Sequence, residues 1–425
     1  MNHKYSSFLK PALESVVEEV DGPVEWAESA DDVVLADELR AMRETSGQME
    51  ATTEKVVALE SVVTLLREER RMTATEARLV SIVADRYGVP MGHRRIGAAL
   101  EAFEGSNGGR LGTITLESFS DHLRKAIEFI ISLLRKLRDH MVRIFSIYSG
   151  KLGALKRTIT TNKDFPNHAK KPMTEQMRTS IAVLFTVNHR FDPRTSISNL
   201  KEVLAGISDN GLVGGVQLYS EQLVELAERF GRDQTESENW RSHVGDFNRL
   251  TPPVPKGFEI RTQDVTETVM VSKTIPGCVR LSYTTVSEGN TAGARGVRER
   301  VKAMAKLGNV QVVDDKANDD PNQLRGLTAD EVRGMWGDVI DAMNEGERTE
   351  KLMQRVAASI EPLTHKIEQL RLNGDGIGSD RGNVINDIIT AVPRSLMFVA
   401  ELGQAALKSA EDCGKCYNLM VYHRI

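Results

Sequence analysis

Aromatic residues are scarce and account for only 5% of the 425 residues. This scarcity argues against a large β-sandwich or barrel, because strands favour aromatic and β-branched side chains. Hydrophobic residues still make up 40% of the chain, which is enough for a substantial core. At roughly 150 residues per folding unit, the length allows two or three units. The composition therefore predicts a mainly α protein built from Leu, Ala and Val helices.

Cysteines and long apolar runs are also few. Cys278, Cys413 and Cys416 cannot form a disulfide framework and indicate a reducing compartment. No apolar run approaches the roughly 20 residues that span a bilayer, and residues 1–20 lack the apolar stretch of a secretory signal. We therefore expect neither a membrane span nor a secreted, disulfide-rich domain.

Motifs that carry catalysis or bind cofactors are missing as well. The glycines of 211–215 lack the Lys-Ser/Thr ending of a phosphate loop, and those of 374–378 do not match the dinucleotide fingerprint. Cys413 and Cys416 have CxxC spacing but no second pair, and the nine histidines are scattered. We expect no catalytic residue, no metal and no cofactor.

Charge is unevenly distributed along the chain. The totals of 55 Lys/Arg and 60 Asp/Glu give a net charge of −5, which excludes a globally basic nucleic-acid binder. Residues 1–117 hold 13 basic and 21 acidic side chains, for a net charge of −8. Residues 118–425 hold 42 and 39, for a net charge of +3. An acidic N-terminal segment thus precedes a near-neutral body, either as a solvated helical face or as a part with a separate role.

The acidic segment has the pattern of helices joined to the body by a linker. Leu and Val at three- and four-residue spacings predict helices over 30–43 and 49–71, and a third helix ends at Tyr87 before Gly88. A short helix is expected near 94–103. The four glycines of 104–113 predict an exposed linker.

The clearest helical pattern follows this linker. Ser118 is a suitable N-cap, and apolar residues at helical spacing run from Phe119 to Tyr148. Nine basic side chains accompany the stripe and are candidate contacts for DNA phosphate: Arg124, Lys125, Arg135, Lys136, Arg138, Arg143, Lys151, Lys156 and Arg157. An anionic membrane or an acidic partner would suit such a helix too, but the wide apolar face favours packing in a bundle. The acidic N-terminal segment is its obvious electrostatic complement.

A short motif recurs four times at or before the start of this helix. Each copy is a small residue or Thr, then Leu, Glu and a small residue. The copies are Ala12-Leu13-Glu14-Ser15, Ala58-Leu59-Glu60-Ser61, Ala99-Leu100-Glu101-Ala102 and Thr115-Leu116-Glu117-Ser118. Leu-Glu pairs are common in helices, but four with matching flanks in one segment favour a shared purpose.

With these motifs, the sequence resembles the internal head proteins of giant tailed bacteriophages of the phiKZ type. Members of that family carry an acidic, helical N-terminal propeptide, which the phage prohead protease cuts after Glu in a small-x-Glu motif. The resemblance implies cleavage between Glu117 and Ser118. Thr115 departs from the usual small residue, so the alternative is cleavage between Glu101 and Ala102. Glu14 and Glu60 would then be sites for cutting up the released propeptide.

The resemblance also implies partners and a location. The expected partners are the prohead protease, other head proteins and packaged DNA, while a membrane is not expected. The chain would be made in the host cytoplasm and reside in the capsid interior. Removal of the propeptide would change the net charge from −5 to +3, which favours residence beside DNA. Delivery into the host, copy number and oligomeric state stay open.

The predicted organisation has three parts. They are a helical propeptide over 1–117, a helical domain over 118–250, and an α+β subdomain over 251–425 with a β-hairpin near 267–286. The prolines after Leu250 favour the second boundary, and Val, Thr and Ile flanking Pro276-Gly277 favour the hairpin. The fold class is a mainly α multi-helix bundle with one small sheet.

Two other functions remain open on the sequence alone. One is a non-catalytic cytoplasmic helical protein that binds partners through the stripe of 119–148. The other is an enzyme of unknown chemistry, because catalytic residues need not lie close together in a sequence.

Overall fold

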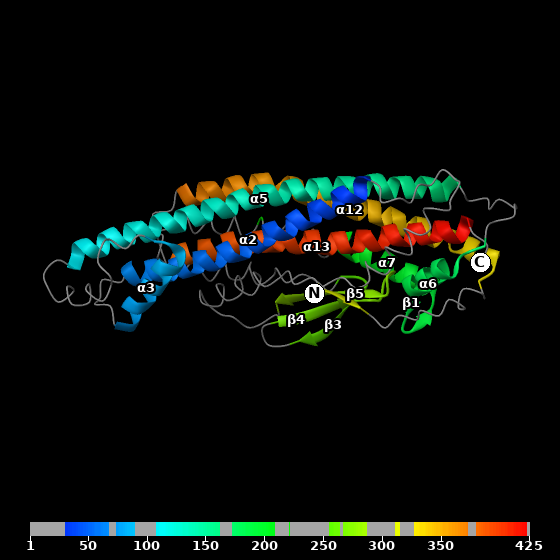
Figure 1. The fold of residues 1–425 in the computed structure, drawn as a ribbon, viewed down its shortest axis with the longest axis horizontal. Coiled ribbons are helices and arrows are strands. Elements are labelled where there is room, and N and C mark those ends of the chain that lie inside the picture. The colour runs from blue at the N-terminus through cyan, green and yellow to red at the C-terminus, as the bar shows by residue number, and fades with distance from the viewer. Residues whose placement is uncertain are drawn as a thin grey trace, which may run out of the picture.

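The computed structural model describes residues 30–67, 74–89, 108–161, 172–208, 221, 255–263, 267–286, 311–314, 327–372 and 380–422. Within them the chain is an elongated bundle of four long helices (Figure 1). These are α2 (Ala30–Arg67), α5 (Gly108–Thr161), α12 (Trp336–Leu372) and α13 (Asp380–Tyr422). Helix α5 has 54 residues and is therefore about 80 Å long.

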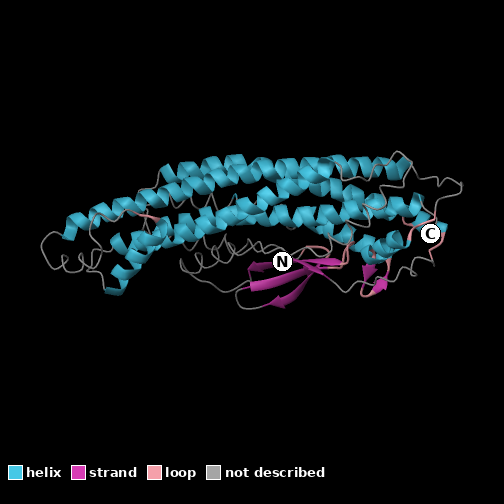
Figure 2. Cartoon of the chain, in the orientation of Figure 1, coloured by secondary structure: helices cyan, strands magenta, loops and turns pink. Residues whose placement is uncertain are grey.

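Shorter elements complete the fold. The helices are α3 (Ala74–Tyr87), α6 (Glu175–Leu184), α7 (Pro193–Ser208) and α11 (Ala329–Gly334). The strands are β1 (Thr186–Val187), β2 (Arg190–Phe191), β3 (Phe258–Gln263), β4 (Glu267–Ser272), β5 (Val279–Val286) and β6 (Gln311–Asp314). Strands β3 to β6 form an antiparallel sheet in sequence order, which lies along one side of the bundle (Figure 2).

The predicted fold class is confirmed. The expected hairpin is β4 and β5, which pair antiparallel with Val269 opposite Thr284. Between them the chain turns through Gly277 and Cys278, both at positive φ (98° and 55°). At Cys278 the positive φ costs energy, because residues with a side chain disfavour this left-handed backbone region. The side chain is buried, so packing rather than backbone preference holds Cys278 in this conformation.

The predicted start of the long basic helix is wrong. Helix α5 begins at Gly108 rather than at Ser118, so 108–113 is helical and not a linker. Each glycine costs a helix about 1 kcal/mol, but extension of an existing helix adds a hydrogen bond for each residue fixed. Ser118 is therefore not an N-cap, and its carbonyl oxygen lies 2.9 Å from Nδ1 of His122.

Helix α2 is one helix and not the two that were predicted. Its apolar stripe continues at seven-residue intervals through the predicted break at 44–48, with every member at most 6% exposed. The stripe is Leu35, Met42, Met49, Val56 and Val63. Gly47 lies between two members and has no atom within 4 Å of an added Cβ, so the helix passes through it on the solvent side. A strict seven-residue repeat is typical of a left-handed helix pair.

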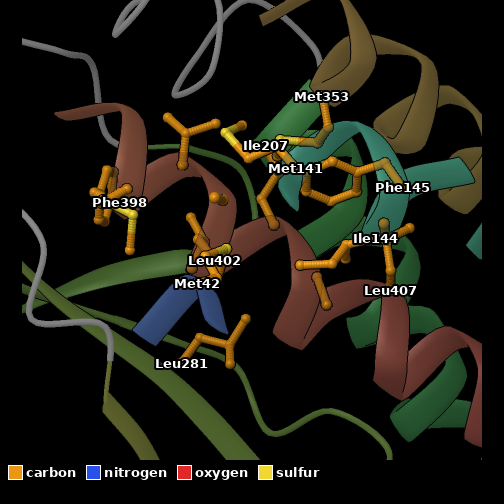
Figure 3. Close-up of a cluster of buried hydrophobic side chains, with 14 of the residues drawn as sticks. Met42, Met141, Ile144, Phe145, Ile207, Leu281, Met353, Phe398, Leu402 and Leu407 are labelled. Carbon is orange, nitrogen blue, oxygen red and sulfur yellow. The ribbon is translucent and has the colours of Figure 1, made fainter. Parts of the chain in front are cut away.

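The core is one continuous cluster of buried apolar side chains that runs from Leu35 to Val421. At its centre, side chains from α2, α5, α7, α12, α13 and β5 meet (Figure 3). Met42, Met141 and Leu281 illustrate the range of elements that contribute. All three predicted parts of the chain supply residues to this cluster. The boundary at 117/118 lies inside α5 and that at 250/251 lies outside the described residues, so the three-part division stays a prediction.

The sheet is attached to the bundle by aromatic contacts and by α7. The ring of Tyr283 on β5 lies 5.4 Å from Phe258 on β3 and 5.0 Å from Phe398 on α13. Nδ2 of the buried Asn199 on α7 donates to the carbonyl oxygen of Thr274 at 2.8 Å. These contacts hold the hairpin against the α7–α13 side of the bundle.

Two glycines allow close approach between α7 and the start of the sheet. A Cβ at Gly206 would overlap the backbone of Lys256. Gly257 has φ +77°, and its Cβ would lie 2.8 Å from the backbone nitrogen of Val203. Since both obstacles are backbone, neither position accepts a larger residue without displacing the strand.

We predict that Gly206→Ala destabilises the fold by about 1–3 kcal/mol, because the methyl group would displace backbone at Lys256. Gly150→Ala is the matched control. Gly150 is also a glycine inside a helix, but nothing lies within 4 Å of its added Cβ, and the change should stabilise by up to about 1 kcal/mol. Urea unfolding followed by circular dichroism measures both. Equal effects of the two changes would contradict the close approach.

Candidate processing site and basic face of helix α5

The bond between Glu117 and Ser118 lies near the N-terminal end of α5. This end forms one tip of the elongated bundle (cyan in Figure 1). Glu117 is exposed, Ser118 is half-buried, and the next residue, Phe119, is completely buried. The predicted site therefore has an accessible glutamate on a helix. A protease would need the first turns of that helix to open. Terminal turns are the part of a helix that opens at the lowest free energy.

The other predicted cleavage residues differ in their surroundings. Glu60 lies inside α2 and is 3% exposed, so it is shielded in the folded chain. Glu14, Glu101 and Ala102 lie outside the described residues. Cleavage at any of these positions stays a prediction.

Six of the nine predicted DNA-contact residues form ion pairs within the protein. Arg124 pairs with Asp121 on its own helix at 3.2 Å, and Arg143 and Lys151 are described below. Three of these side chains join α5 to α12: Arg135 pairs with Glu368 at 2.7 Å and with Glu361 at 3.7 Å, Arg138 pairs with Glu361, and Lys156 pairs with Glu347 at 2.8 Å. The basic face of α5 thus serves first to hold neighbouring helices.

Helix α2 supplies the acidic complement that the sequence predicts, and the electrostatic pairing is confirmed. Glu38 is only 12% exposed and accepts from His140 at 2.6 Å and from Arg143 at 2.8 Å. Asp32 pairs with Lys151. Burial by itself raises the pKa of Glu38, but the hydrogen bonds and charges of His140 and Arg143 outweigh it and hold this pKa below its usual value.

Lys125, Lys136 and Arg157 are exposed and have no carboxylate partner within the described ranges. Lys125 and Lys136 are separated by about three helical turns and lie on the same side of α5. Arg157 lies within about 60° of that line at 100° per residue. These three cations form the accessible part of the predicted phosphate-contact surface, whose binding to DNA stays a prediction.

A buried carboxylate on α13 links three helices. Glu411 is completely buried and accepts from Lys415 at 2.6 Å and from Lys151 of α5 at 3.3 Å. Burial raises its pKa, but the lysines around it, Lys408 included, outweigh that effect and lower the pKa. Since Lys151 also pairs with Asp32 of α2, the chain of charges runs from α2 through α5 to α13.

Sequence reasoning missed this carboxylate. The available signal was the spacing of Lys408, Glu411 and Lys415, which places both lysines on the glutamate's side of a helix. That spacing is common on solvated faces and does not reveal burial.

The two cysteines of the CxxC spacing lie inside α13. Cys413 and Cys416 are free and buried. Burial raises the pKa of the Cys413 thiol to about 12, and it raises the pKa of Cys416 in the same way. Both thiols are protonated at neutral pH and act as small apolar core residues. Among the described residues no group of His, Cys, Asp or Glu could hold a metal ion.

This geometry defines an elongated helical bundle whose charged side chains mainly join its own helices. None of the described helices combines the length and apolar character that crossing a membrane requires. A model of the phiKZ-like phage internal head proteins matches residues 16–396, and the chain belongs to this family. It is therefore a structural protein of the virion, located inside the capsid. No curated protein and no solved structure shows significant similarity to the chain.

A second acidic side chain on α13 is coupled to α2. Glu401 is largely removed from solvent, and its closest charged influences are Arg43 and Glu50 of α2. Burial raises the pKa of Glu401 to about 7. Because the folded state holds this proton more tightly than the unfolded chain, the Glu401 contribution is favourable at low pH. It is lost as the pH rises from about 4.5 through 7.

We predict that Glu401→Gln stabilises the fold at pH 8.5 by about 1–3 kcal/mol and has little effect at pH 5. The amide removes the cost of burying a charge, which the wild type avoids at low pH by binding a proton. Urea midpoints at the two pH values measure the effect. Glu44→Gln, at an exposed position of α2, is the control and should be neutral at both. A pH-independent effect of Glu401→Gln would contradict the raised pKa.

Proposed function

We propose that this internal head protein is matured by a single proteolytic cut at the end of its acidic N-terminal segment, after Glu117 or after Glu101. The prohead protease would make the cut, and the product would serve as a non-catalytic head component beside other head proteins. Membership in the internal head protein family together with the recurring Leu-Glu motif supports this proposal. The observation that carries it for Glu117 is the exposure of that side chain near the N-terminal end of α5.

The structure of the site favours Glu117 over Glu60. Protease subsites accept extended backbone, so a cut in a helix requires local opening. Glu117 is exposed near the N-terminal end of α5, where a helix opens most easily, whereas Glu60 is 3% exposed on the packing surface of α2. We therefore expect the cut near the α5 tip to precede any cut in α2.

We predict that the chain recovered from purified virions starts at Ser118, or at Ala102 if the earlier site is used. N-terminal sequencing or intact-mass measurement decides between them. Phage that carries Glu117→Gln should lose the Ser118 start, because the motif requires a glutamate before the cut bond. Glu101→Gln should have no effect on that start.

Glu128→Gln is the control for these variants, since Glu128 is also an exposed glutamate of α5 but lies outside the motif. This change should leave the start of the mature chain as it is. Chains that begin at Met1 in mature particles would refute processing. A Ser118 start that survives Glu117→Gln would refute the role of the glutamate.

We also propose that packaged DNA contacts the protein through Lys125, Lys136 and Arg157. Their exposure and the lack of carboxylate partners within the described chain support this choice. The other six basic residues are engaged by Asp or Glu, so they would have to exchange one anion for another. Three phosphate contacts give weak binding that depends steeply on salt.

We predict that the full chain binds a random-sequence DNA duplex with a slope of log K against log salt of about −3, and that the Lys125→Gln, Lys136→Gln, Arg157→Gln triple variant lowers the slope toward zero. Fluorescence anisotropy between about 50 and 200 mM salt measures it. Lys351→Gln, Arg355→Gln, Lys366→Gln removes three exposed cations from α12 and is the control. An equal loss in both triple variants would contradict a specific surface on α5.

A further inference from the structure

The segment that the proposed cut would separate is packed into the fold as a helical pair, α2 and α3. Tyr87 of α3 lies under the ammonium of Lys55 of α2 at 5.8 Å, and Arg86 lies 4.0 Å from Glu54. Val80 and Val83 of α3 belong to the same buried cluster as α2. Residues 30–67 and 74–89, here called the α2 segment, thus form a unit that is larger than one helix.

The α2 segment meets the body along a seam with a seven-residue repeat. The second row of the seam lies three residues after each member of the apolar stripe, as in a heptad helix pair. It consists of Glu38, Thr45, Thr52, Leu59 and Leu66, which are buried or partly buried. The hydroxyls of Thr45 and Thr52 donate to backbone carbonyls four residues earlier at 2.8 and 2.7 Å, so they bring no unmet hydrogen bond into the seam.

The body offers a matching apolar face. On α5 the buried side chains Ile130, Leu134, Leu137, Met141 and Ile144 follow alternating four- and three-residue steps. Met42 of the α2 segment enters the central cluster in which Met141 and Leu402 also lie (Figure 3). Separation of the two parts would expose both faces to water, and each large apolar side chain disfavours that exposure strongly.

Partly buried ion pairs between α2 and α5 also stabilise this seam. Glu38 is held by His140 and Arg143, and Asp32 is held by Lys151. Lys151 also pairs with the fully buried Glu411. In the folded chain the side chains of His140 and Lys151, which contact these carboxylates, are only 19% and 11% exposed. Hydrogen bonds of carboxylates with partners that are this well shielded from water favour the bound state of the segment.

We infer that the cut does not release the α2 segment, which stays bound to the body as a separate chain. This inference rests on the proposed processing. The mature particle then contains a two-chain protein, and the partner of the α5–α13 face is the protein's own N-terminal segment. The acidic charge of the retained part stays with the body, so a cut alone does not turn the protein basic. Glu60 stays shielded at 3% exposure for as long as the segment is bound.

The test uses the full chain with a recognition sequence for a site-specific protease inserted after Glu104. The folded protein is cut and passed over a size-exclusion column at neutral pH, and the fractions are analysed by denaturing electrophoresis. We expect the two pieces to elute together as one peak at the position of the uncut chain. Elution of the N-terminal piece alone would overturn the inference.

Two variants of neighbouring acidic residues show whether the described contacts hold the segment. Glu38→Gln removes the charged partner of His140 and Arg143 and should raise the dissociation rate of the cut segment roughly tenfold or more, because a hydrogen bond between charged groups is worth about 1.5–3 kcal/mol. Asp37→Asn changes a 66% exposed residue whose partner among the described residues is Arg40 of the same helix, and it should leave the rate unchanged. Equal rates for both variants would contradict the seam.

A measurement on virions tests whether the α2 segment is retained and distinguishes retention from the proposed processing. Quantitative mass spectrometry should find peptides from residues 30–67 at the same copy number as peptides from α13, together with a new N-terminus at Ser118 or Ala102. A new N-terminus without the 30–67 peptides would overturn retention and leave processing intact. An unbroken chain from Met1 would refute processing, and the cut-chain experiment would still decide retention.

Discussion

The other three long helices that the structure describes all pack against α5, and the rest of the described fold depends on that contact. Helices α2, α12 and α13 all lie along it, and its apolar stripe from Phe119 to Leu152 is buried at each step. Its polar side is used in the same way, because Arg135, Arg143 and Lys151 each reach a carboxylate on a different neighbour. Helix α5 therefore holds three other helices together, and most of its basic residues serve to stabilise the fold.

The arrangement changes how the charge asymmetry of the chain is understood. Read along the sequence, an acidic leader and a basic helix are two segments with different purposes. In the folded molecule they are two sides of one interface, since Asp32 and Glu38 of α2 face Lys151, His140 and Arg143. The N-terminal segment is therefore part of the architecture whether or not the chain is cut after it. This applies to the residues from Ala30 onward, which the structure describes.

The sequence predicted much of the fold because its signals were local. The helical stripe of α5, the stop at Gly88 after α3, and the Val- and Thr-rich hairpin of β4 and β5 each lie within one short window. The errors have a common physical cause. The glycines at 108–112 and the polar stretch near Gly47 were predicted to interrupt helices. Packing against neighbouring helices instead allows a long helix to continue through such positions.

The candidate site was harder to predict. The sequence marked nine basic residues alike, and only tertiary structure separates Lys125 and Lys136, which face solvent, from Arg135 and Lys151, which are bound. No local pattern indicates that Glu411 is buried or that Cys413 lies in the core. The family resemblance was recognisable because it depended on a motif and on the order of segments, both of which can be seen without knowledge of the tertiary structure.

The two ends of the α2 seam differ in polarity, so they also differ in how strongly they hold the helix to the body. Near its N-terminal end the second row holds Glu38, Thr45 and Thr52, and toward its C-terminal end it holds Leu59 and Leu66. Water can solvate the first half at a lower cost than the second. Separation of α2 from the body would therefore start near Ala30 and meet its largest cost at Leu59 and Leu66.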